Sequence, residues 1–507
     1  MIQPQASPNF TLSHAEVRSV IIGLMLAILL GALDQTIVAV ALPMMSAELQ
    51  GFDLLAWVVS GYLVAVAVAT PIYGKLGDLY GRRAMLSSAI AVFLAASVAS
   101  AMAQSMPMLV AARIVQGLGG GGLISVAQAT IADVVAPRDR GRFQGYISGA
   151  FAVASVSGPL AGGFLTAYLS WRWVFWINLP LGLAAFVISR RALARLPVPH
   201  IKRPVDYPGA LLLSLGLSVL LIGITRVGQG VAWSEALNLR LFFVALAALV
   251  AFLWQERRAA EPIIPLDLLR MPTVSICCSI LFIAFFQIVS LSVLIPLRLQ
   301  MMTDTGVEGA ALQLIPLSLA IPFGAYIGGS LTARSGHFKR IQLSGALMVP
   351  LAVLGVALID PQTTIAGVLL MAVTGFGIGL QLPTSMVAVQ NAVPHRHVGI
   401  ATAVTAFSRS LGAAVGIAIL MALLLTILHD KASTLPGLLS GADIVKSMLS
   451  AAVEAAPTMG HELHAQLRVV VQDAFQMLFT LSALVALSAV ALVAMIPDQV
   501  LSEQMVH

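Results

Sequence analysis

The chain has 507 residues, of which 59% are hydrophobic and 10% are charged, and its formal net charge is +6. A soluble globular domain has about 25% charged residues, so charge at less than half this density cannot cover the surface of a soluble protein of this size. The composition therefore excludes a soluble enzyme, a disordered chain and a disulfide scaffold, and it predicts a polytopic membrane protein. The two cysteines, Cys277 and Cys278, are neighbours in an apolar run, where they offer neither a disulfide nor a metal site.

Apolar runs long enough to cross a bilayer recur along the whole chain. A spanning helix needs about 20 predominantly apolar residues, and these runs lack the alternation of membrane β-strands. We expect an all-α polytopic protein with fourteen transmembrane helices. The predicted spans lie near 19–40, 54–74, 84–104, 108–131, 143–168, 173–189, 207–225, 238–255, 273–297, 309–332, 341–359, 364–386, 399–428 and 474–496.

The basic residues predict how these spans are oriented. If the N-terminus lies in the cytoplasm, nineteen of the 28 Lys and Arg residues fall on the cytoplasmic side, seven fall outside, and Arg113 and Arg409 lie within spans. Cytoplasmic loops carry the excess of Lys and Arg in membrane proteins. We therefore expect both termini in the cytoplasm, and we interpret the basic surplus as a sign of membrane orientation rather than of nucleic-acid binding.

Short motifs repeat at nearly one offset, which predicts two related halves. The pairs are 74–81 with 329–336 (offset 255), 117–119 with 375–377 (offset 258) and Pro137 with Pro394 (offset 257). Parallel repeats of this kind occur in transporters, where the substrate site lies between the halves. We expect six-helix halves at 1–195 and 261–507, with two inserted helices in 196–260.

Five ordered motifs carry a family resemblance. They are the span-1 sequence 33–43, the loop 74–83, the span-4 sequence 109–117, the span-5 sequence 157–163 and the corner 171–180. Together they resemble the signatures of the major facilitator superfamily, specifically its fourteen-span drug:proton antiporter branch. The resemblance covers essentially the whole chain. It implies a multi-pass protein of the bacterial inner membrane that exports small amphipathic or hydrophobic compounds against proton entry by alternating access, without a cofactor or metal.

Asp34 is the only acidic residue deep in a predicted span. At 1.5 Å per residue it lies about 13 Å from the outer end of span 1, and Arg113 lies about 9 Å from the outer end of span 4. A charge inside the bilayer is costly, and it marks either a function or a required partner. We expect Asp34 and Arg113 to form the proton-coupling pair, with a carboxylate that becomes neutral when it is protonated. The alternative is a fixed structural ion pair.

The loop after span 2 predicts a conformational latch. Its residues are Gly74, Asp78, Gly81, Arg82 and Arg83. A carboxylate at Asp78 would be stabilised by the partly positive N-terminus of another helix, which we expect to be that of span 13 near Gly399. The alternative is a solvated turn. Ala333 replaces the acid in the second copy, so the latch is expected in the first half alone.

Two glycine-rich segments predict close helix packing. The antiporter motif of span 5 consists of Gly158, Pro159, Gly162 and Gly163. Its glycines allow close approach to a neighbouring helix, and its proline bends the span, which suits a tight seal between the halves. Residues 117–122 match G-x-G-x-x-G but lie inside an apolar span, so they indicate packing and not a dinucleotide site.

Polar or aromatic residues at depth are the candidates for a substrate cavity. They are Trp57, Tyr62, Gln287, Gln313, Gln381 and Arg409. Any one of them would equally serve to hydrogen-bond a neighbouring helix, and Arg409 either favours anionic or polar groups or binds helix carbonyls. Met371 takes the place of Arg113 in the second half, so we expect coupling charge in the first half alone. With Asp34 as the one acid, a dicationic drug would be poorly neutralised.

The longest connection, 430–473, is predicted to face outward as an amphipathic hairpin on the membrane surface or over the outer mouth. Docking of a periplasmic adaptor protein and a passive linker are the alternatives. We expect a monomer whose partners are its small-molecule substrate, protons and the lipid bilayer. Two other functions stay open: an exporter of an endogenous lipid-like molecule, siderophore or metabolite, and a non-transporting membrane sensor. An enzyme is not expected, because no nucleophile, base and metal occur together at membrane depth.

Overall fold

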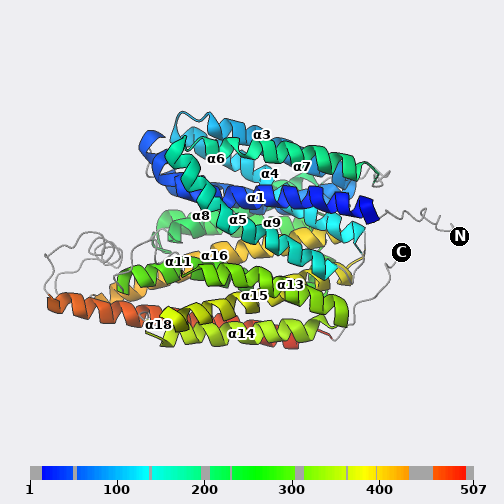
Figure 1. Ribbon diagram of the computed structural model, residues 1–507. Helices are drawn as coiled ribbons and strands as arrows, with labels where there is room; N and C mark the ends of the chain where they lie inside the picture. Colours follow the sequence, from blue (N-terminus) through cyan, green and yellow to red (C-terminus); the bar gives the residue numbers. More distant parts are fainter. Residues whose placement is uncertain are drawn as a thin grey trace.

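The computed structural model describes residues 14–49, 54–135, 140–195, 206–228, 231–302, 313–360, 364–394, 397–432 and 461–497. Within these ranges every regular element is a helix, which confirms the all-α class. The long helices run side by side in one bundle, and the start of α1 and the end of α18 lie at the same end of it (Figure 1). We call this end the terminal end and the other the opposite end.

The helices fall into three groups along the chain. The N-terminal helices are α1 (His14–Leu49), α2 (Leu55–Tyr80), α3 (Arg82–Ala101), α4 (Met106–Val134), α5 (Arg140–Tyr168), α6 (Trp173–Trp176) and α7 (Asn178–Ala192). The middle helices are α8 (Tyr207–Gly228), α9 (Ala236–Glu256) and α10 (Leu266–Arg270). The C-terminal helices are α11 (Pro272–Met302), α13 (Ile315–Ser335), α14 (Phe338–Leu358), α15 (Thr364–Ala392), α16 (Val398–Ala432) and α18 (His461–Ala494).

Every predicted span has a helix at its place. Thirteen helices of the described ranges are long and apolar enough to cross a membrane. The predicted fifth span corresponds to α5, a helix of 29 residues that is not among the thirteen. This helix packs between α1 and α13. The predicted sixth span is divided into the short α6 and the longer α7.

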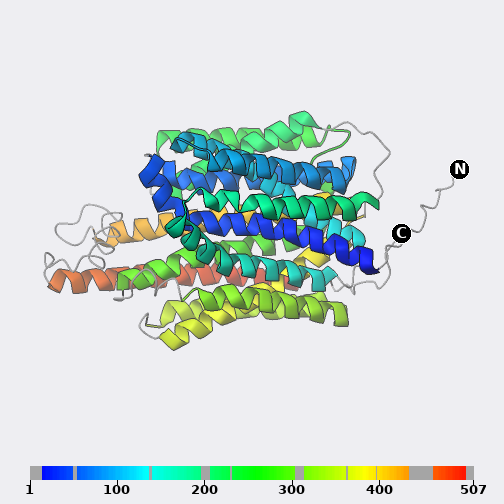
Figure 2. The ribbon, with the colours of Figure 1, turned by 45° about the horizontal axis from the view of Figure 1, so that its top comes forward.

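Two helices are longer than the predicted spans, and this changes where Arg298 and the segment 430–473 lie. Helix α11 continues to Met302, so Arg298 lies inside a helix and not in an outer loop as its place beyond span 9 implied. Helix α18 already begins at His461, so the predicted outer segment 430–473 includes its first residues. In both views α18 extends beyond the neighbouring helices at the opposite end (Figures 1 and 2). Residues 433–460, and with them most of the predicted hairpin, lie outside the described residues.

The repeated glycine motifs make equivalent contacts in the two groups of helices. A Cβ added at Gly117 would collide with the backbone oxygen of Tyr62, and one added at Gly375 would collide with that of Leu317. These glycines therefore allow α2 to approach α4, and α13 to approach α15, at backbone distance. Gly81 and Gly336 also correspond, with φ of 89° and 70° in the left-handed region that favours glycine. The domain boundaries themselves stay a prediction.

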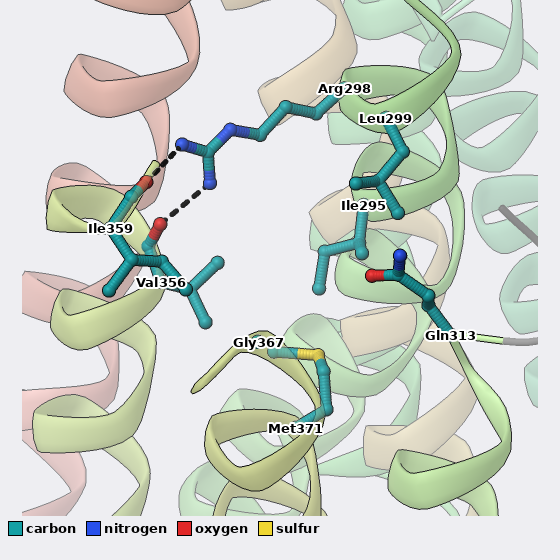
Figure 3. A pocket seen from close by; sticks show the side chains of 8 residues that line it. All are labelled: Ile295, Arg298, Leu299, Gln313, Val356, Ile359, Gly367 and Met371. Atoms are coloured by element: carbon teal, nitrogen blue, oxygen red, sulfur yellow. Dashed lines mark hydrogen bonds between the residues drawn. The ribbon is translucent and has the colours of Figure 1, made fainter. Parts of the chain in front are cut away.

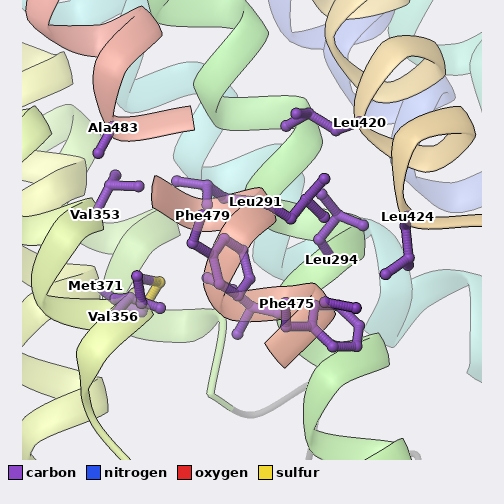
Figure 4. Packing of buried hydrophobic residues seen from close by; sticks show 14 of the residues in the cluster. Leu291, Leu294, Val353, Val356, Met371, Leu420, Leu424, Phe475, Phe479 and Ala483 are labelled. Carbon is purple, nitrogen blue, oxygen red and sulfur yellow. The ribbon is translucent and has the colours of Figure 1, made fainter. Parts of the chain in front are cut away.

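Buried apolar side chains fill the centre of each group of helices. Among the C-terminal helices the cluster joins α11, α14, α15, α16 and α18 through Leu291, Val353, Met371, Leu420 and Phe475 (Figure 4). In lipid this packing stabilises by dispersion and shape complementarity rather than by exclusion of water. A second cluster includes α2, α8, α11 and α16, and thereby holds the middle helices against both other groups.

Candidate functional site

The structure brings Asp34 and Arg113 into direct contact. Arg113 Nη1 lies 2.6 Å from Asp34 Oδ2, and the two side chains are 1% and 0% exposed. The pair joins α1 to α4, as their similar predicted depths implied. Because both charges are sealed from solvent, each depends on its neighbours for stabilisation.

Neutral amides complete the shell around the Asp34 carboxylate. Gln116 Nε2 and Asn178 Nδ2 each donate to Asp34 Oδ1, both at 2.9 Å. The same two nitrogens also donate to Ser97 Oγ, at 3.0 and 2.8 Å. The carboxylate thus accepts three hydrogen bonds from α4 and α7, and Ser97 of α3 aligns the two amides. A charged carboxylate with three donors is well stabilised.

The sequence offered weak signals for these residues. Gln116 follows Arg113 by three positions and so lies on the same face of α4. Asn178 belongs to the corner motif 171–180, but nothing in its spacing points to Asp34. Which neighbour a neutral amide faces depends on how its helix is rotated about its axis. A helix that is apolar on all sides has no polar face from which this rotation could be predicted.

Arg113 is further held by a carbonyl and by aromatic rings. Its Nε donates to the backbone oxygen of Val58 at 3.3 Å, and its Nη1 donates to Gln116 Oε1 at 2.8 Å. Its guanidinium carbon lies 4.1 Å from the ring centre of Tyr62 and 5.8 Å from that of Phe175. Cation–π contacts of this kind strengthen when they are desolvated. Tyr62, predicted as a cavity residue, packs its ring against this guanidinium.

The antiporter motif packs directly beside Asp34. A Cβ added at Gly158 would collide with Thr36 Oγ1, and one added at Gly162 would lie 2.7 Å from the backbone oxygen of Ile37. Thr36 Oγ1 donates to the backbone oxygen of Ala154 at 2.9 Å, which ties α1 to α5. Gly163 has no such neighbour within 4 Å, and the side chain of Pro159 lies outside what the structure describes. Two of the three motif glycines therefore serve the α1–α5 contact.

The predicted latch is assembled at the terminal end. The backbone N–H of Ile400, in the first turn of α16, donates to Asp78 Oδ2 at 3.1 Å. Arg82 Nη2 lies 2.5 Å from Asp78 Oδ1. A Cβ at Gly399 would collide with the Asp78 carboxylate, so a glycine at this position lets the carboxylate reach the helix N-terminus. The expected partner helix and the expected arginine are both present.

The latch contains an acidic residue that the sequence did not identify. Arg82 Nε donates to Asp133 Oδ2 at 2.7 Å, so Arg82 bridges two carboxylates from α2 and α4. Asp133 escaped notice because span 4 was predicted to end two residues before it. Gly74 packs against Ala403 of α16, whereas Arg83 is exposed. Arg82 rather than Arg83 therefore holds Asp78.

Other polar contacts link the groups of helices at the same end. Lys75 Nζ lies 2.9 Å from Glu261 Oε2, which ties α2 to the segment after α9. Arg140 Nη1 donates to Asn391 Oδ1 at 2.9 Å, which ties α5 to α15. Burial lowers the pKa of the Arg140 guanidinium to about 10, so this arginine still carries its charge at neutral pH. The terminal end is thus closed by several polar contacts besides the latch.

The remaining cavity candidates have different surroundings. Gln287 is buried and paired reciprocally with Ser482: its Nε2 donates to the Ser482 backbone oxygen and its Oε1 accepts from Ser482 Oγ, both at 2.7 Å. Gln381 Nε2 donates at 3.2 Å to Gly377 of its own helix. Trp57 is half-buried near the start of α2. Both glutamines therefore hydrogen-bond helices in this structure, and each uses one of the two N–H groups of its amide in doing so.

Gln313 lines a small cavity with Arg298 near the opposite end. The cavity has a volume of about 30 Å³ and lies between α11, α14 and α15 (Figure 3). Arg298 is 4% exposed, and its guanidinium donates to the backbone oxygens of Val356 at 2.7 Å and Ile359 at 2.8 Å. These oxygens belong to the C-terminal turn of α14, where a cation is favoured. Met371 also lines this cavity, so a buried cation lies beside the position that corresponds to Arg113. The expectation that coupling charge is confined to the first half stays a prediction.

Arg409 lies where three helices from both groups meet. Its Nη2 donates to Gln128 Oε1 of α4 at 3.1 Å, and its guanidinium carbon lies 5.5 Å from the ring centre of Phe285 of α11. The sequence left two roles open for Arg409, binding a polar or anionic group or binding helix carbonyls. The contacts that the structure describes are with a side-chain amide and an aromatic ring.

This combination of features defines a class of protein: a bundle of membrane-spanning helices in two similarly packed groups, with one sealed charge pair and a polar closure at one end. The class is that of membrane transporters rather than enzymes. The chain belongs to the Major Facilitator Superfamily, which matches residues 24–417.

Relatives with curated names support this assignment. An uncharacterized MFS-type transporter of Mycobacterium tuberculosis is 35% identical over 85% of this chain, although the chain spans only 62% of that relative's length. Multidrug resistance protein 3 of Bacillus subtilis is 33% identical over 81% of this chain and 80% of its own. An MFS-type transporter of the acurin A biosynthesis cluster of Aspergillus aculeatus is 30% identical over 78% of this chain and 72% of its own.

Solved structures share the fold at low sequence identity. The human organic anion transporter TETRAN has a TM-score of 0.63 and 14% identity over 94% of this chain and 99% of its own. The proton:xylose symporter XylE has a TM-score of 0.61 and 15% identity over 97% of this chain and 99% of its own. These likenesses support the major facilitator fold.

Proposed function

We propose that this transporter exports small amphipathic compounds from the cytoplasm in exchange for protons. The observation that carries the proposal is the buried Asp34 carboxylate, which can be neutralised by a proton in a place where charge is costly. Proton entry supplies about 2.3 kcal/mol per 100 mV of membrane potential and about 1.4 kcal/mol per pH unit. The multidrug name of a 33% identical relative supports the substrate class.

The contacts of Asp34 suggest how protonation would act on the helices. Arg113, Gln116 and Asn178 all donate to this carboxylate, and a protonated carboxyl group is a much weaker acceptor. Protonation would therefore loosen α1 from α4 and α7. Thr36 and Ile37 follow Asp34 and contact the glycines of α5, and α5 packs against α13. A shift of α1 could in this way reach the C-terminal helices.

The closure at the terminal end would be the other half of the cycle. If the basic end faces the cytoplasm, the contacts of Asp78, Lys75 and Arg140 hold the inner side shut. Alternating access requires these contacts to break when the inner side opens. Because a single backbone N–H at a helix terminus is involved at Asp78, the latch is weak enough to be reversible.

Transport in proteoliposomes tests the proposal. Native protein should accumulate an amphipathic dye when a pH gradient is imposed, and it should release protons when the dye binds. Asp34→Asn imitates the protonated state, so it should lose gradient-driven accumulation while it still binds a neutral dye, at equal amounts of folded protein. The matched control is Asp267→Asn, which removes a carboxylate that is 90% exposed. Native rates and native pH dependence in Asp34→Asn would remove this residue from the mechanism.

Export of an endogenous metabolite is a second candidate. It is favoured by the relative whose name places it in a biosynthesis cluster. Deleting the gene in its host and comparing released small molecules would separate the two: a missing metabolite with unchanged drug tolerance favours the second candidate.

A further inference from the structure

Arg409 is a cation at the meeting point of the two groups of helices that has no acidic partner among the described residues. Its one hydrogen bond there goes to a neutral amide oxygen, that of Gln128, and its one ring contact is with Phe285. A guanidinium has five N–H donors, so most of its hydrogen-bonding capacity is unused. Arg409 as a whole residue is partly rather than fully buried.

Gln128 supplies a second unused donor at the same place. This residue is 0% exposed, and its Nε2 has no hydrogen-bond partner among the described residues. An unsatisfied buried amide N–H costs free energy, and such an atom in a native protein calls for an explanation. An acceptor placed between Gln128 and Arg409 would satisfy both groups at once.

The charge of Arg409 makes that acceptor an anion. Arg409 forms no ion pair with a carboxylate among the described residues, so a bound anion would compensate its positive charge. Phe285 offers an aromatic face beside this charge for the apolar body of a ligand.

We infer that Arg409 and Gln128 form the binding site for a carboxylate or sulfonate group of the exported compound. The inference deepens the proposed function by naming the substrate class: amphipathic anions are favoured over neutral and cationic compounds of the same shape. The bound group would replace Gln128 Oε1 as the acceptor for Arg409. Since Gln128 belongs to α4 and Arg409 to α16, the ligand would thereby compete with a contact between the two groups of helices.

Two dyes of one skeleton test this inference. The anion 1-anilinonaphthalene-8-sulfonate and the neutral N-phenyl-1-naphthylamine differ by one sulfonate group. Their binding to purified protein in nanodiscs is measured by fluorescence titration against protein-free nanodiscs, without any proton gradient. A hydrogen-bonded charge pair corresponds to about 10-fold or more in affinity. We expect the native protein to prefer the anion by about this factor.

Substitutions of Arg409 decide between a binding role and a purely structural one. Arg409→Gln should bring the ratio of the two dissociation constants close to one, chiefly by weakening the anion, and Arg409→Lys should keep the preference for the anion. The control Arg270→Gln removes an arginine that is 75% exposed and should leave the ratio unchanged. If Arg409 served only to hold α16 against α4, Arg409→Gln would affect both dyes alike.

An unchanged ratio in Arg409→Gln, or no preference in the native protein, would overturn the inference. These outcomes differ from failure of the proposed function. That failure would appear as a lack of gradient-driven dye accumulation in proteoliposomes, whereas the binding ratio is measured without a gradient.

Discussion

Removing Asp34 and removing Arg113 should lower the stability of the protein by different amounts. Removing one member of a buried ion pair typically costs about 3–5 kcal/mol, because the other charge is left without a partner. A carboxyl group can escape this cost by binding a proton, but a guanidinium cannot lose its proton in a protein. The loss of Asp34 should therefore destabilise the protein more than the loss of Arg113.

The contacts set the expected magnitudes. In Asp34→Asn the 1%-exposed Arg113 keeps the oxygens of Gln116 and Val58 and the ring of Tyr62, which offset part of the loss, so we expect about 3 kcal/mol. In Arg113→Gln the carboxyl group keeps Gln116 and Asn178 as donors and can bind a proton, so we expect about 1–2 kcal/mol. The double variant removes both charges and should recover most of the stability lost in Asp34→Asn.

Thermal unfolding with a thiol-reactive fluorophore measures these differences. The chain has two cysteines, Cys277 and Cys278, and both are buried, so the dye reacts as the helices separate. Asp34→Asn should unfold at the lowest temperature of the three variants. If Arg113→Gln unfolded at a lower temperature, or if the double variant were no more stable than Asp34→Asn, the asymmetry between the partners would be refuted.

Three further predictions follow from other contacts. Asp78→Asn should slow transport and lower the unfolding free energy by about 1–2 kcal/mol, because Asn keeps an oxygen for the Ile400 N–H while Arg82 loses one of its two carboxylates. Unchanged transport in vesicles at equal expression would contradict the latch. Gln287→Leu should cost about 1–3 kcal/mol because Ser482 loses its buried partner, and adding Ser482→Ala should recover part of it without altering dye binding; altered dye selectivity would instead return Gln287 to the cavity. Reporter fusions after Arg195 and Arg270 should show cytoplasmic activity, and an outside location for either would reverse the assigned orientation.

The sequence predicted the helices well because a membrane allows few alternatives. Backbone groups in lipid must be hydrogen-bonded within a segment, so an apolar run of sufficient length is a helix almost by necessity. The pairing of Asp34 with Arg113 could be predicted for a similar reason, since a buried charge requires an opposite charge at its depth. The glycine motifs indicated where helices approach closely, and at Gly117 and Gly375 a Cβ would indeed collide with the backbone of the neighbouring helix.

The partners of these charges were harder to predict. Gln116, Asn178 and Ser97 are neutral, and a neutral polar residue in a span can hydrogen-bond a neighbouring helix, another side chain or a ligand, with no charge to indicate which. Asp133 was not identified and Arg298 was assigned to a loop because each lies just beyond the end of a predicted span, whereas the helices continue to Val134 and Met302. At such ends, apolar content does not distinguish a loop residue from one on the last helical turn.

The surroundings of Arg298 indicate which of the two groups of helices would respond to a proton. The cavity beside it lies where Met371 replaces Arg113, and the acidic residue that acts electrostatically on Arg298 is Asp360, beyond the end of α14 and not among the residues that line the cavity. Arg298 is fixed to the end of α14 by two carbonyls and cannot change its charge. The C-terminal helices would therefore move as a unit that does not itself respond to protons, displaced by the N-terminal helices through the contact between α5 and α13. Substitutions that make the C-terminal helices more rigid would then leave transport intact, whereas substitutions that make α1 more rigid would block it.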